Sequence, residues 1–330
     1  MRPSPQVVPF GPDHLDAATS LLSDRQRRLR ALRPELPTAF EESAAHLPTL
    51  RALLERDGAS GVAAVSDGAM AGFLIGYPRR EPIWGRACWS PIDGSALADA
   101  SDPELIRDLY AAWSRHFVEL GHFRQYVHVP ADDPDLTAAW FHTGFGIMQA
   151  HAVRDLELAA LAPDGVTVRR ALPGDIDRIE DLLPLIAEAL ARPPAYAVRL
   201  PEQLATYRDS WAEELEEPSA HHWLAEDGDQ VLAMATFYAA DPGPMVPEGA
   251  WELAVAMARP EARGRGLMRA LLAAGFAEAR ESGATQCITD WRTAALPTHR
   301  SWTALGFRPT HYRLHRHVDE RIAWAGGRRG

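Results

Sequence analysis

The stretch that decides the fold runs from Trp251 to Leu272 and reads WELAVAMARPEARGRGLMRALL. Its first part, Glu252–Ala258, is largely apolar and predicts a strand. A helix is predicted from Gly266 to Glu281, because apolar residues recur there at helical spacing. Two arginines and two glycines, Arg263-Gly264-Arg265-Gly266, form the turn between the strand and the helix. The segment therefore predicts a strand, a glycine-rich turn and an amphipathic helix in succession.

Such a turn has the chemistry of an anion site. The first N–H groups of a helix lack partners and carry partial positive charge, and glycine lets an anion approach the backbone closely. The turn thus indicates a cradle for pyrophosphate. The dinucleotide fingerprint is not met, because position 269 is Arg, and a P-loop is excluded, because the chain has no Lys. The alternative is a solvated turn that only starts the helix.

The chain repeats itself. Trp140 is followed by Gly144-Phe145, and in the second half of the chain Trp302 is followed by Gly306-Phe307 at the same spacing. Upstream, two apolar runs turn at Asp67-Gly68 and at Asp227-Gly228, which are separated by nearly the same offset along the sequence. Landmarks in one order with a nearly constant offset indicate two copies of one unit.

Both copies predict the same elements. Each opens with a short strand and a helix, continues with a hairpin at its Asp-Gly turn, and closes with a strand, a long helix and further strands. In the first copy the long helix is expected over Pro103–Leu120, with Ser101 and Glu104 as a capping box. The fold class is α+β, with a mixed, mostly antiparallel sheet flanked by helices in each copy. We expect domains at 1–160 and 161–330, divided within Leu158–Gly165.

Composition excludes several kinds of chemistry. All 34 basic residues are Arg, so the chain has no lysine for a Schiff base, and it has no Asn for a Cys-His-Asn site. The net charge of −11 argues against nucleic acid as a partner. No run approaches a membrane span, and with only two cysteines a reducing, cytoplasmic compartment is expected. No cluster of ligand residues predicts a metal site.

The residues quoted above resemble a known family. The turn Arg263–Gly266 between a strand and a helix looks like the acetyl-CoA loop of the GNAT N-acetyltransferases, and Trp302 with Gly306-Phe307 looks like that family's closing signature. The order of strands and helices is similar in both copies. The resemblance covers nearly the whole chain as two tandem GNAT-like domains, an organisation similar to that of mycothiol synthase. The family loop ends in Gly or Ala, whereas this chain has Met268 there.

The resemblance implies that acetyl-CoA is the cosubstrate and that the C-terminal copy holds it. The residues that it assigns to acetyl-CoA are Met257 and Ala258 on the strand and Arg263, Gly264, Arg265, Gly266, Leu267 and Met268 in the loop. Backbone N–H groups of the loop would bind pyrophosphate, and the strand would pair with the pantetheine arm and polarise the acetyl carbonyl.

Glu252 is the candidate catalytic residue. It lies on the strand eleven residues before Arg263, and family members that acetylate proteins have their general-base Glu at similar spacing. Beside Trp251 in an apolar run, its carboxyl group would be partly desolvated, which raises the pKa. The alternative is a solvent-facing Glu at a sheet edge.

Two departures from the family pattern stand out. Trp302 occupies the place where many members have a Tyr as general acid, and an indole N–H is not an acid at neutral pH. His299 and Tyr312 are weak substitutes. The first copy has no Arg-Gly turn, and Asp102 stands where the second copy has Gly264, so we expect this copy to be degenerate and not to bind acetyl-CoA in the usual way.

The sequence therefore predicts an N-acetyltransferase that transfers acetyl from acetyl-CoA to a primary amine of a small molecule, by direct attack in a ternary complex. Its partners would be the amine acceptor, with no nucleic acid and no membrane, and a homodimer is allowed. An acidic run at 213–217 would favour a cationic acceptor. The alternatives are a non-catalytic acyl-CoA or small-molecule binding protein and a protein N-acetyltransferase.

Overall fold

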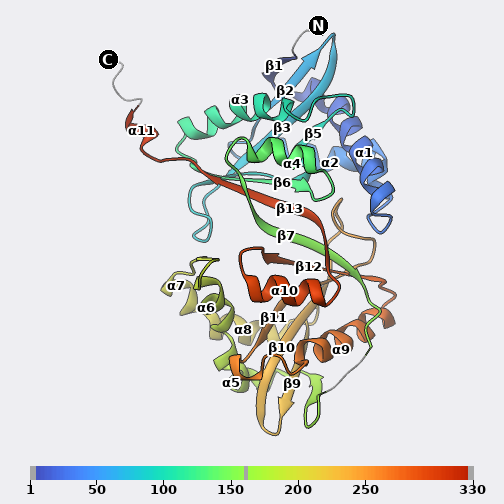
Figure 1. Cartoon of the computed structure of the whole chain (residues 1–330), viewed down its shortest axis with the longest axis vertical. Helices are drawn as coiled ribbons and strands as arrows, with labels where there is room; N and C mark the ends of the chain where they lie inside the picture. Colours follow the sequence, from blue (N-terminus) through green and yellow to red (C-terminus); the bar gives the residue numbers. More distant parts are fainter. Residues whose placement is uncertain (1–4, 160–162, 326–330) are drawn as a thin grey trace. The chain divides into compact units, whose positions relative to one another are not determined.

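The computed structural model describes residues 5–159 and 163–325, and these form two compact units (Figure 1). Unit 1 comprises the described residues of Met1–Gln149, Gly243–Met245 and Thr310–Gly330. Unit 2 comprises those of Ala150–Pro242 and Val246–Pro309. The units are therefore not two consecutive stretches of chain, since each takes in a strand from the end of the other copy.

Unit 1 contains a sheet in the order β1-β2-β3-β4-β6-β13, with β5 alongside β3. Its strands are β1 (Gln6–Pro9), β2 (Ser60–Ser66), β3 (Ala69–Arg79), β4 (Ala87–Ser90), β5 (Ser95–Leu97), β6 (Arg124–Pro130) and most of β13 (Arg308–His317). Its helices are α1 (Leu15–Leu32), α2 (Ser43–Leu54), α3 (Leu105–Glu119), α4 (Pro134–Phe141) and α11 (Ile322–Ala325). The β4–β6 pair is parallel, and β13 pairs antiparallel with β6.

Unit 2 contains the order β12-β11-β10-β9-β8. Its strands are β8 (Thr167–Arg170), β9 (His221–Asp227), β10 (Gln230–Ala239), β11 (Trp251–Ala258) and β12 (Gln286–Arg292), with the second part of β7 (Gly146–Asp155) beside β12. Its helices are α5 (Ile176–Ile179), α6 (Leu185–Ala191), α7 (Pro201–Leu204), α8 (Tyr207–Glu216), α9 (Leu267–Glu281) and α10 (Leu296–Ala304). The β11–β12 pair is parallel, whereas β10 pairs antiparallel with both neighbours.

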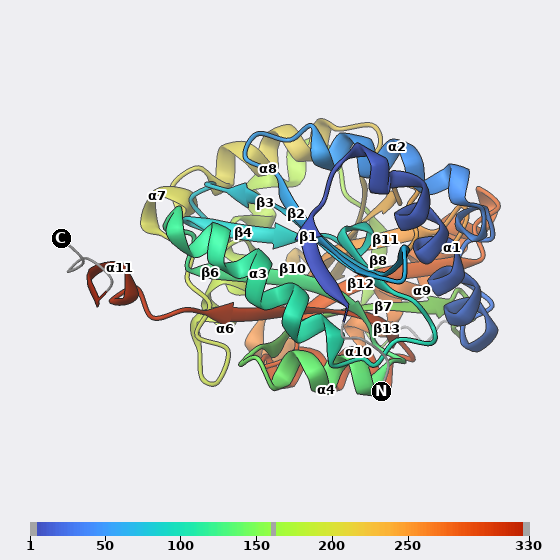
Figure 2. The ribbon, with the colours of Figure 1, turned by 90° about the horizontal axis from the view of Figure 1, so that it is seen from above.

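Helices cover both faces of each sheet. In unit 1, apolar residues of α3 and α4 pack with Ala64 and Leu74 on one face, and α1 and α2 pack with Ala63 and Phe73 on the other. Figure 2 shows α3 and α1 on opposite sides of β1. This alternation follows from the two-residue period of a strand, which turns neighbouring side chains to opposite faces. The predicted α+β class and the mostly antiparallel mixed sheet are confirmed.

The repeat is visible in the element boundaries. The helices α3 and α9 begin at Leu105 and Leu267, and the same offset along the sequence separates the starts of β6 and β12 and of α4 and α10. The Asp-Gly hairpin in unit 1 has φ of 51° at Asp67 and 78° at Gly68. Positive φ at both positions gives the turn the twist that a tight hairpin needs.

Some predicted details were wrong. The long helix of the first copy begins at Leu105, and the Ser101 hydroxyl donates to the carbonyl of Ala71 instead of capping it. The Asp102 carboxylate accepts from the N–H of Glu104 in its place. The first helix of the second copy is broken into short pieces, although its apolar residues pack into one core as expected. No helix in the described ranges has both the length and the apolar character needed to cross a membrane.

Candidate active site

The strand β11 separates from its parallel neighbour in the middle of unit 2. It pairs with β12 only at Trp251 and Glu252, and the Thr289 hydroxyl donates to the Leu253 carbonyl at 2.8 Å just beyond. On its other side the register with β10 skips Ala254, which forms a β-bulge with its side chain exposed. Bulges redirect a strand and often lie beside active sites. From Ala254 onward, β11 therefore has no strand partner on the β12 side within the described residues.

The predicted turn follows β11 and starts α9. Gly264 and Gly266 have φ of 79° and 82°, a left-handed conformation that strongly favours glycine. The residues from Arg263 to Gly266 are exposed, and a Cβ placed on Gly264 would meet nothing within 4 Å. The first backbone bond of the helix runs from Ala270 N–H to the Gly266 carbonyl at 3.2 Å. The N–H groups of Leu267 and Met268 thus have no intrahelical acceptor, and they lie next to an open turn.

The arginines of the turn differ in their contacts. Arg265 pairs with Asp227 at 3.1 Å, and both side chains are partly exposed. Arg263 forms no ion pair with any residue that the structure describes. Since the helix N-terminus adds partial positive charge, the turn is an electropositive, exposed backbone cradle. Met268, which stands where the family loop has Gly or Ala, is half-buried at the first turn of α9.

Glu252 lies where β11 and β12 begin to part. It is half-buried, opposite Tyr238 of β10 and Ile288 of β12. Burial raises the pKa of its carboxyl group, and the negative charges of Asp290 and Asp241 raise it further. A carboxylate with a raised pKa, at the start of an unpaired strand edge, is suited to accept a proton.

Tyr238 and Glu214 extend this acidic surface. The Tyr238 hydroxyl donates to the Glu214 carboxylate on α8, and burial together with that carboxylate raises the tyrosine pKa. Glu214 belongs to the acidic run, so one residue of that run is bound to the sheet instead of being only solvated. Tyr238, Asp241 and Asp290 were not singled out from the sequence, because cross-strand register brings them near Glu252 and local spacing does not show it.

The candidates for a general acid lie in different places. Trp302 is buried, with its ring edge-on to Phe307 at 5.7 Å between centroids, which is a core contact. The Trp291 indole donates to Nδ1 of His299 at 3.1 Å, which leaves Nε2 as the protonated nitrogen of a neutral ring. Tyr312 belongs to unit 1, where it pairs with Val129 of β6. Of the two substitutes, only His299 lies in the unit that holds Glu252.

The first copy has a different structure at the same position. Its strand is interrupted: β4 ends at Ser90, Ile92–Gly94 forms a short 3₁₀ turn, and β5 resumes at Ser95. A Cβ on Gly94 would lie 2.6 Å from the Ile75 carbonyl oxygen, so this turn is tightly packed. Four residue pairs join β4 to β6, compared with two between β11 and β12. Beyond this turn β5 pairs only with β3 among the described residues, so unit 1 keeps a short, tightly packed counterpart of the unpaired edge in unit 2.

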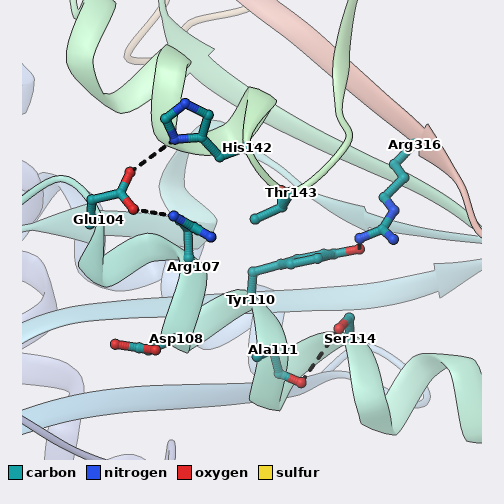
Figure 3. A pocket seen from close by; sticks show the side chains of 9 residues that line it. All are labelled: Glu104, Arg107, Asp108, Tyr110, Ala111, Ser114, His142, Thr143 and Arg316. Carbon is teal, nitrogen blue, oxygen red and sulfur yellow. Dashed lines mark hydrogen bonds and ion pairs between the residues drawn. The ribbon is translucent and has the colours of Figure 1, made fainter.

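A groove with a volume of about 630 Å³ lies in unit 1 over α3 (Figure 3). Figure 3 shows the Glu104 carboxylate between Arg107 and His142, and the Tyr110 hydroxyl beside Arg316. The charged groups drawn there largely pair with one another. None of the lining residues is one that the sequence assigns to acetyl-CoA or catalysis.

Comparisons with known proteins agree with this geometry. The model of the acetyltransferase (GNAT) family matches residues 185–307, which include Glu252 and the whole turn. A GCN5-related N-acetyltransferase from Sphaerobacter thermophilus superposes with a TM-score of 0.60 at 16% identity, over 94% of each chain. A GCN5-related glucosamine N-acetyltransferase region of a fungal multi-domain β-N-acetylglucosaminidase gives 0.54 at 15% identity, over 96% of this chain and 38% of that one.

A tandem GNAT protein from the clavulanic acid biosynthesis pathway gives a TM-score of 0.48 at 17% identity, over 95% of this chain and 98% of the other. A search of curated proteins finds no match. At these identities the solved structures show the fold, and the family match lies on the segment that contains the cradle and Glu252. The second copy is thus similar to the GNAT acetyltransferase family over residues 185–307, and the chain as a whole has a fold similar to that of solved GCN5-related N-acetyltransferases.

Proposed function

We propose that unit 2 transfers the acetyl group of acetyl-CoA to a primary amine of a small molecule. The observation that carries the proposal is the combination of a strand edge after Glu252 that does not pair with β12 and an open, electropositive turn at the start of α9. The two features follow one another along a single segment of chain, as an extended thioester with a pyrophosphate at one end requires.

The residues present fit acetyl-CoA. Backbone N–H groups of Arg263, Gly264, Arg265, Gly266, Leu267 and Met268 would bind the pyrophosphate, aided by the helix N-terminus. The free edge of β11 up to Met257 and Ala258 would pair with the amides of the pantetheine arm. A backbone N–H of this edge would hold the acetyl oxygen as it gains negative charge. Acetyl-CoA itself supplies the activated acyl group.

Glu252 would act as the general base. Its carboxylate takes a proton from the acceptor's ammonium group, directly or through a water, and the free amine then attacks the thioester carbon. The C–N bond forms, the C–S bond breaks, and the thiolate leaves with the electron pair. Because Trp302 is buried against Phe307, the thiolate takes its proton from water or from another donor. His299 does not supply it while its Nδ1 accepts from Trp291, because the remaining Nε2–H of a neutral imidazole is not an acid at neutral pH.

A small cationic acceptor suits the charges around Glu252. Asp241 and Asp290 lie close enough to affect its pKa, and Glu214 is held nearby through Tyr238. Such a surface raises the local concentration of ammonium groups. We therefore propose that the acceptor is a polyamine or another positively charged amine. It would bind on the side of the sheet where α8 packs. The protein as a whole would work in the cytoplasm, and a homodimer is compatible with this proposal.

The test is release of free thiol from acetyl-CoA in the presence of a panel of small amines, with the acetylated product identified by mass spectrometry. Turnover with one or more amines supports the proposal. Acetyl-CoA binding without turnover on any amine would favour a non-catalytic acyl-CoA-binding role of this site. Mass shifts on a protein substrate, with none on small amines, would favour a protein N-acetyltransferase.

A further inference from the structure

A second, smaller cavity lies in unit 1, with a volume of about 110 Å³. It is lined by α1, by the segment from Ser95 to Pro103, and by residues at the ends of β6 and α4. At the sequence offset that relates α3 to α9, Ser95–Ser101 corresponds to Met257–Arg263 in unit 2. The cavity therefore occupies the place in the first copy that the acetyl-CoA strand and turn occupy in the second.

Arg25 of α1 lines this cavity and is buried, with 7% of its surface exposed. Its Nη1 donates to the carbonyl of Ile92 at 2.8 Å and to that of Ser95. Its Nε and Nη2 are buried and have no hydrogen-bond acceptor among the described residues. Burial lowers the pKa of this guanidinium to about 10, so the group still carries its charge at neutral pH. An unpartnered buried donor is costly, and a buried charge more so.

The nearest buried carboxylate forms no hydrogen bond with Arg25. Asp93 contacts His46, with Oδ1 at 2.9 Å from Nδ1, while Nε2 of His46 lies 2.9 Å from the Phe40 carbonyl. A carbonyl oxygen only accepts, so Nε2 carries a proton, and the Nδ1–Oδ1 contact shares one more. The charge of Asp93 raises the pKa of Arg25, but its carboxylate contacts His46 and accepts no hydrogen bond from Arg25.

The unpartnered edge of Arg25 is the edge that this chain uses elsewhere to bind carboxylates. Nε and Nη2 of Arg33 contact the two oxygens of Asp132 at 2.7 and 3.0 Å. The same two atoms of Arg169 contact the Glu226 carboxylate at 3.0 and 2.6 Å. The planar fork formed by these two N–H groups matches the spacing of carboxylate oxygens.

The rest of the lining favours a single negative charge. Arg28 also lines the cavity and lies close enough to Arg25 to lower its pKa, while its own partner is the exposed Asp99 at 3.4 Å. Asp133 is a further lining carboxylate, already engaged as the cap of α4 through the Leu136 N–H at 2.9 Å. The carboxylates of Asp99 and Asp133 would repel a dianion, and the cavity volume excludes a nucleotide.

We propose that this cavity of unit 1 binds the carboxylate group of a small organic acid, with Arg25 as the buried anchor and Arg28 at its side. The first copy would then keep a ligand site at the place of the acetyl-CoA site, changed from a nucleotide cradle to a carboxylate pocket. This inference does not depend on the acceptor proposed for unit 2.

The test uses the full chain in the absence of acetyl-CoA, and its probe is sodium propionate. Propionate should raise the thermal midpoint in a saturable way, beyond the effect of sodium chloride at equal ionic strength, because ligand binding to the folded state shifts unfolding. Propionamide, which has the same shape without the charge, should give no saturable shift. Arg28→Gln should weaken propionate binding about tenfold or more. The matched control is Arg27→Gln on the same helix, which pairs with Asp24 and does not line the cavity, and its affinity should be unchanged.

If Arg25→Gln folds, propionate should no longer raise its thermal midpoint in a saturable way. If it does not fold, Arg28→Gln still tests the proposal. Equal affinity of R27Q and R28Q for propionate would overturn the proposal, and so would the absence of any saturable shift in the wild-type chain. Tighter binding of inorganic phosphate than of propionate would overturn the carboxylate assignment. None of these experiments measures acetyl transfer by unit 2. If the proposed function of unit 2 were wrong, their outcome would not change.

Discussion

The guanidinium of Arg154 lies over the ring of Phe276 in unit 2, 5.0 Å from its centroid, although Arg154 belongs to the first copy of the repeat and Phe276 to the second. Nη1 of Arg154 also donates to the Leu305 carbonyl, one residue before Gly306. Arg316 occupies the equivalent position in the second copy and contacts Tyr110 in unit 1, with Nη1 at 3.0 Å from the hydroxyl. Each copy thus supplies an arginine from its last strand to the other unit.

This exchange predicts that Arg154 stabilises unit 2. Arg154→Ala should lower the free energy of unfolding by about 2 kcal/mol, because it removes a cation–π contact and the donor to the partly buried Leu305 and Glu157 carbonyls. Urea unfolding followed by tryptophan fluorescence measures the change. Arg300→Ala removes an exposed arginine of α10 in the same unit and should cost little. Equal stability of the two variants would contradict the assigned role of Arg154.

The glycine turn predicts a binding defect that is separate from catalysis. Gly266→Ala places a Cβ on a residue with φ of 82°, which strains the turn by about 1 kcal/mol or more. We expect the Kd for acetyl-CoA to rise about tenfold, while kcat at saturating acetyl-CoA falls much less. Gly228→Ala is the control, since Gly228 also has positive φ, 57°, but lies in the hairpin that follows β9. A similar change of Kd in both variants would show that strain alone, and not the cradle, accounts for the loss.

The buried ion pair of Asp175 predicts a pH-dependent stability. Hydrogen bonds from Arg169 above all, with the Leu172 N–H and Arg178, hold the pKa of the Asp175 carboxyl well below its usual range. A carboxyl whose pKa is lowered by folding stabilises the protein above its unfolded pKa of about 3.9, and this stabilisation is lost as the pH falls.

Asp175→Asn should therefore cost about 2 kcal/mol at pH 7, and the difference from wild type should shrink below about pH 4. Denaturant titrations at several pH values measure it. Asp177→Asn changes the next acidic residue, which is 77% exposed and pairs only at the surface, and should have a small effect throughout. A cost for D175N that stays constant down to pH 3 would argue against the ion pair as its source.

Local patterns predicted the parts of the fold that depend on neighbouring residues. The hairpin at Asp67-Gly68, the helix after Gly266 and the turn between β11 and α9 all follow from residue types within a few positions. The exchange of β7 and β13 could not be predicted in this way, because no local pattern in either last strand shows which of the two sheets it joins. Likewise, Ala254 looks like any strand residue, and only the register against β10 shows that it is a bulge.

The candidate site likewise has residues that local sequence identifies and residues that only the fold brings together. Glu252 and the turn lie in one continuous segment and could be identified from the sequence. Tyr238, Asp241 and Asp290 come from other segments, and only strand pairing brings them to Glu252. Arg25 looked like one of many helix arginines, because nothing in the residues around it shows that its side chain is buried.

The central claim is that Glu252 accepts the proton from the amine, and one comparison tests it most directly: kcat of the wild type and of Glu252→Gln, with the Kd for acetyl-CoA measured on both. The account predicts that kcat falls about 10²–10⁴-fold while the Kd stays within about twofold. It also predicts that the wild-type rate rises with pH through the raised pKa of Glu252 and that this limb disappears in the variant. Glu281→Gln, at the exposed end of α9, should keep both the rate and the pH profile. A kcat of E252Q equal to that of the wild type, with the same pH profile, would contradict the account.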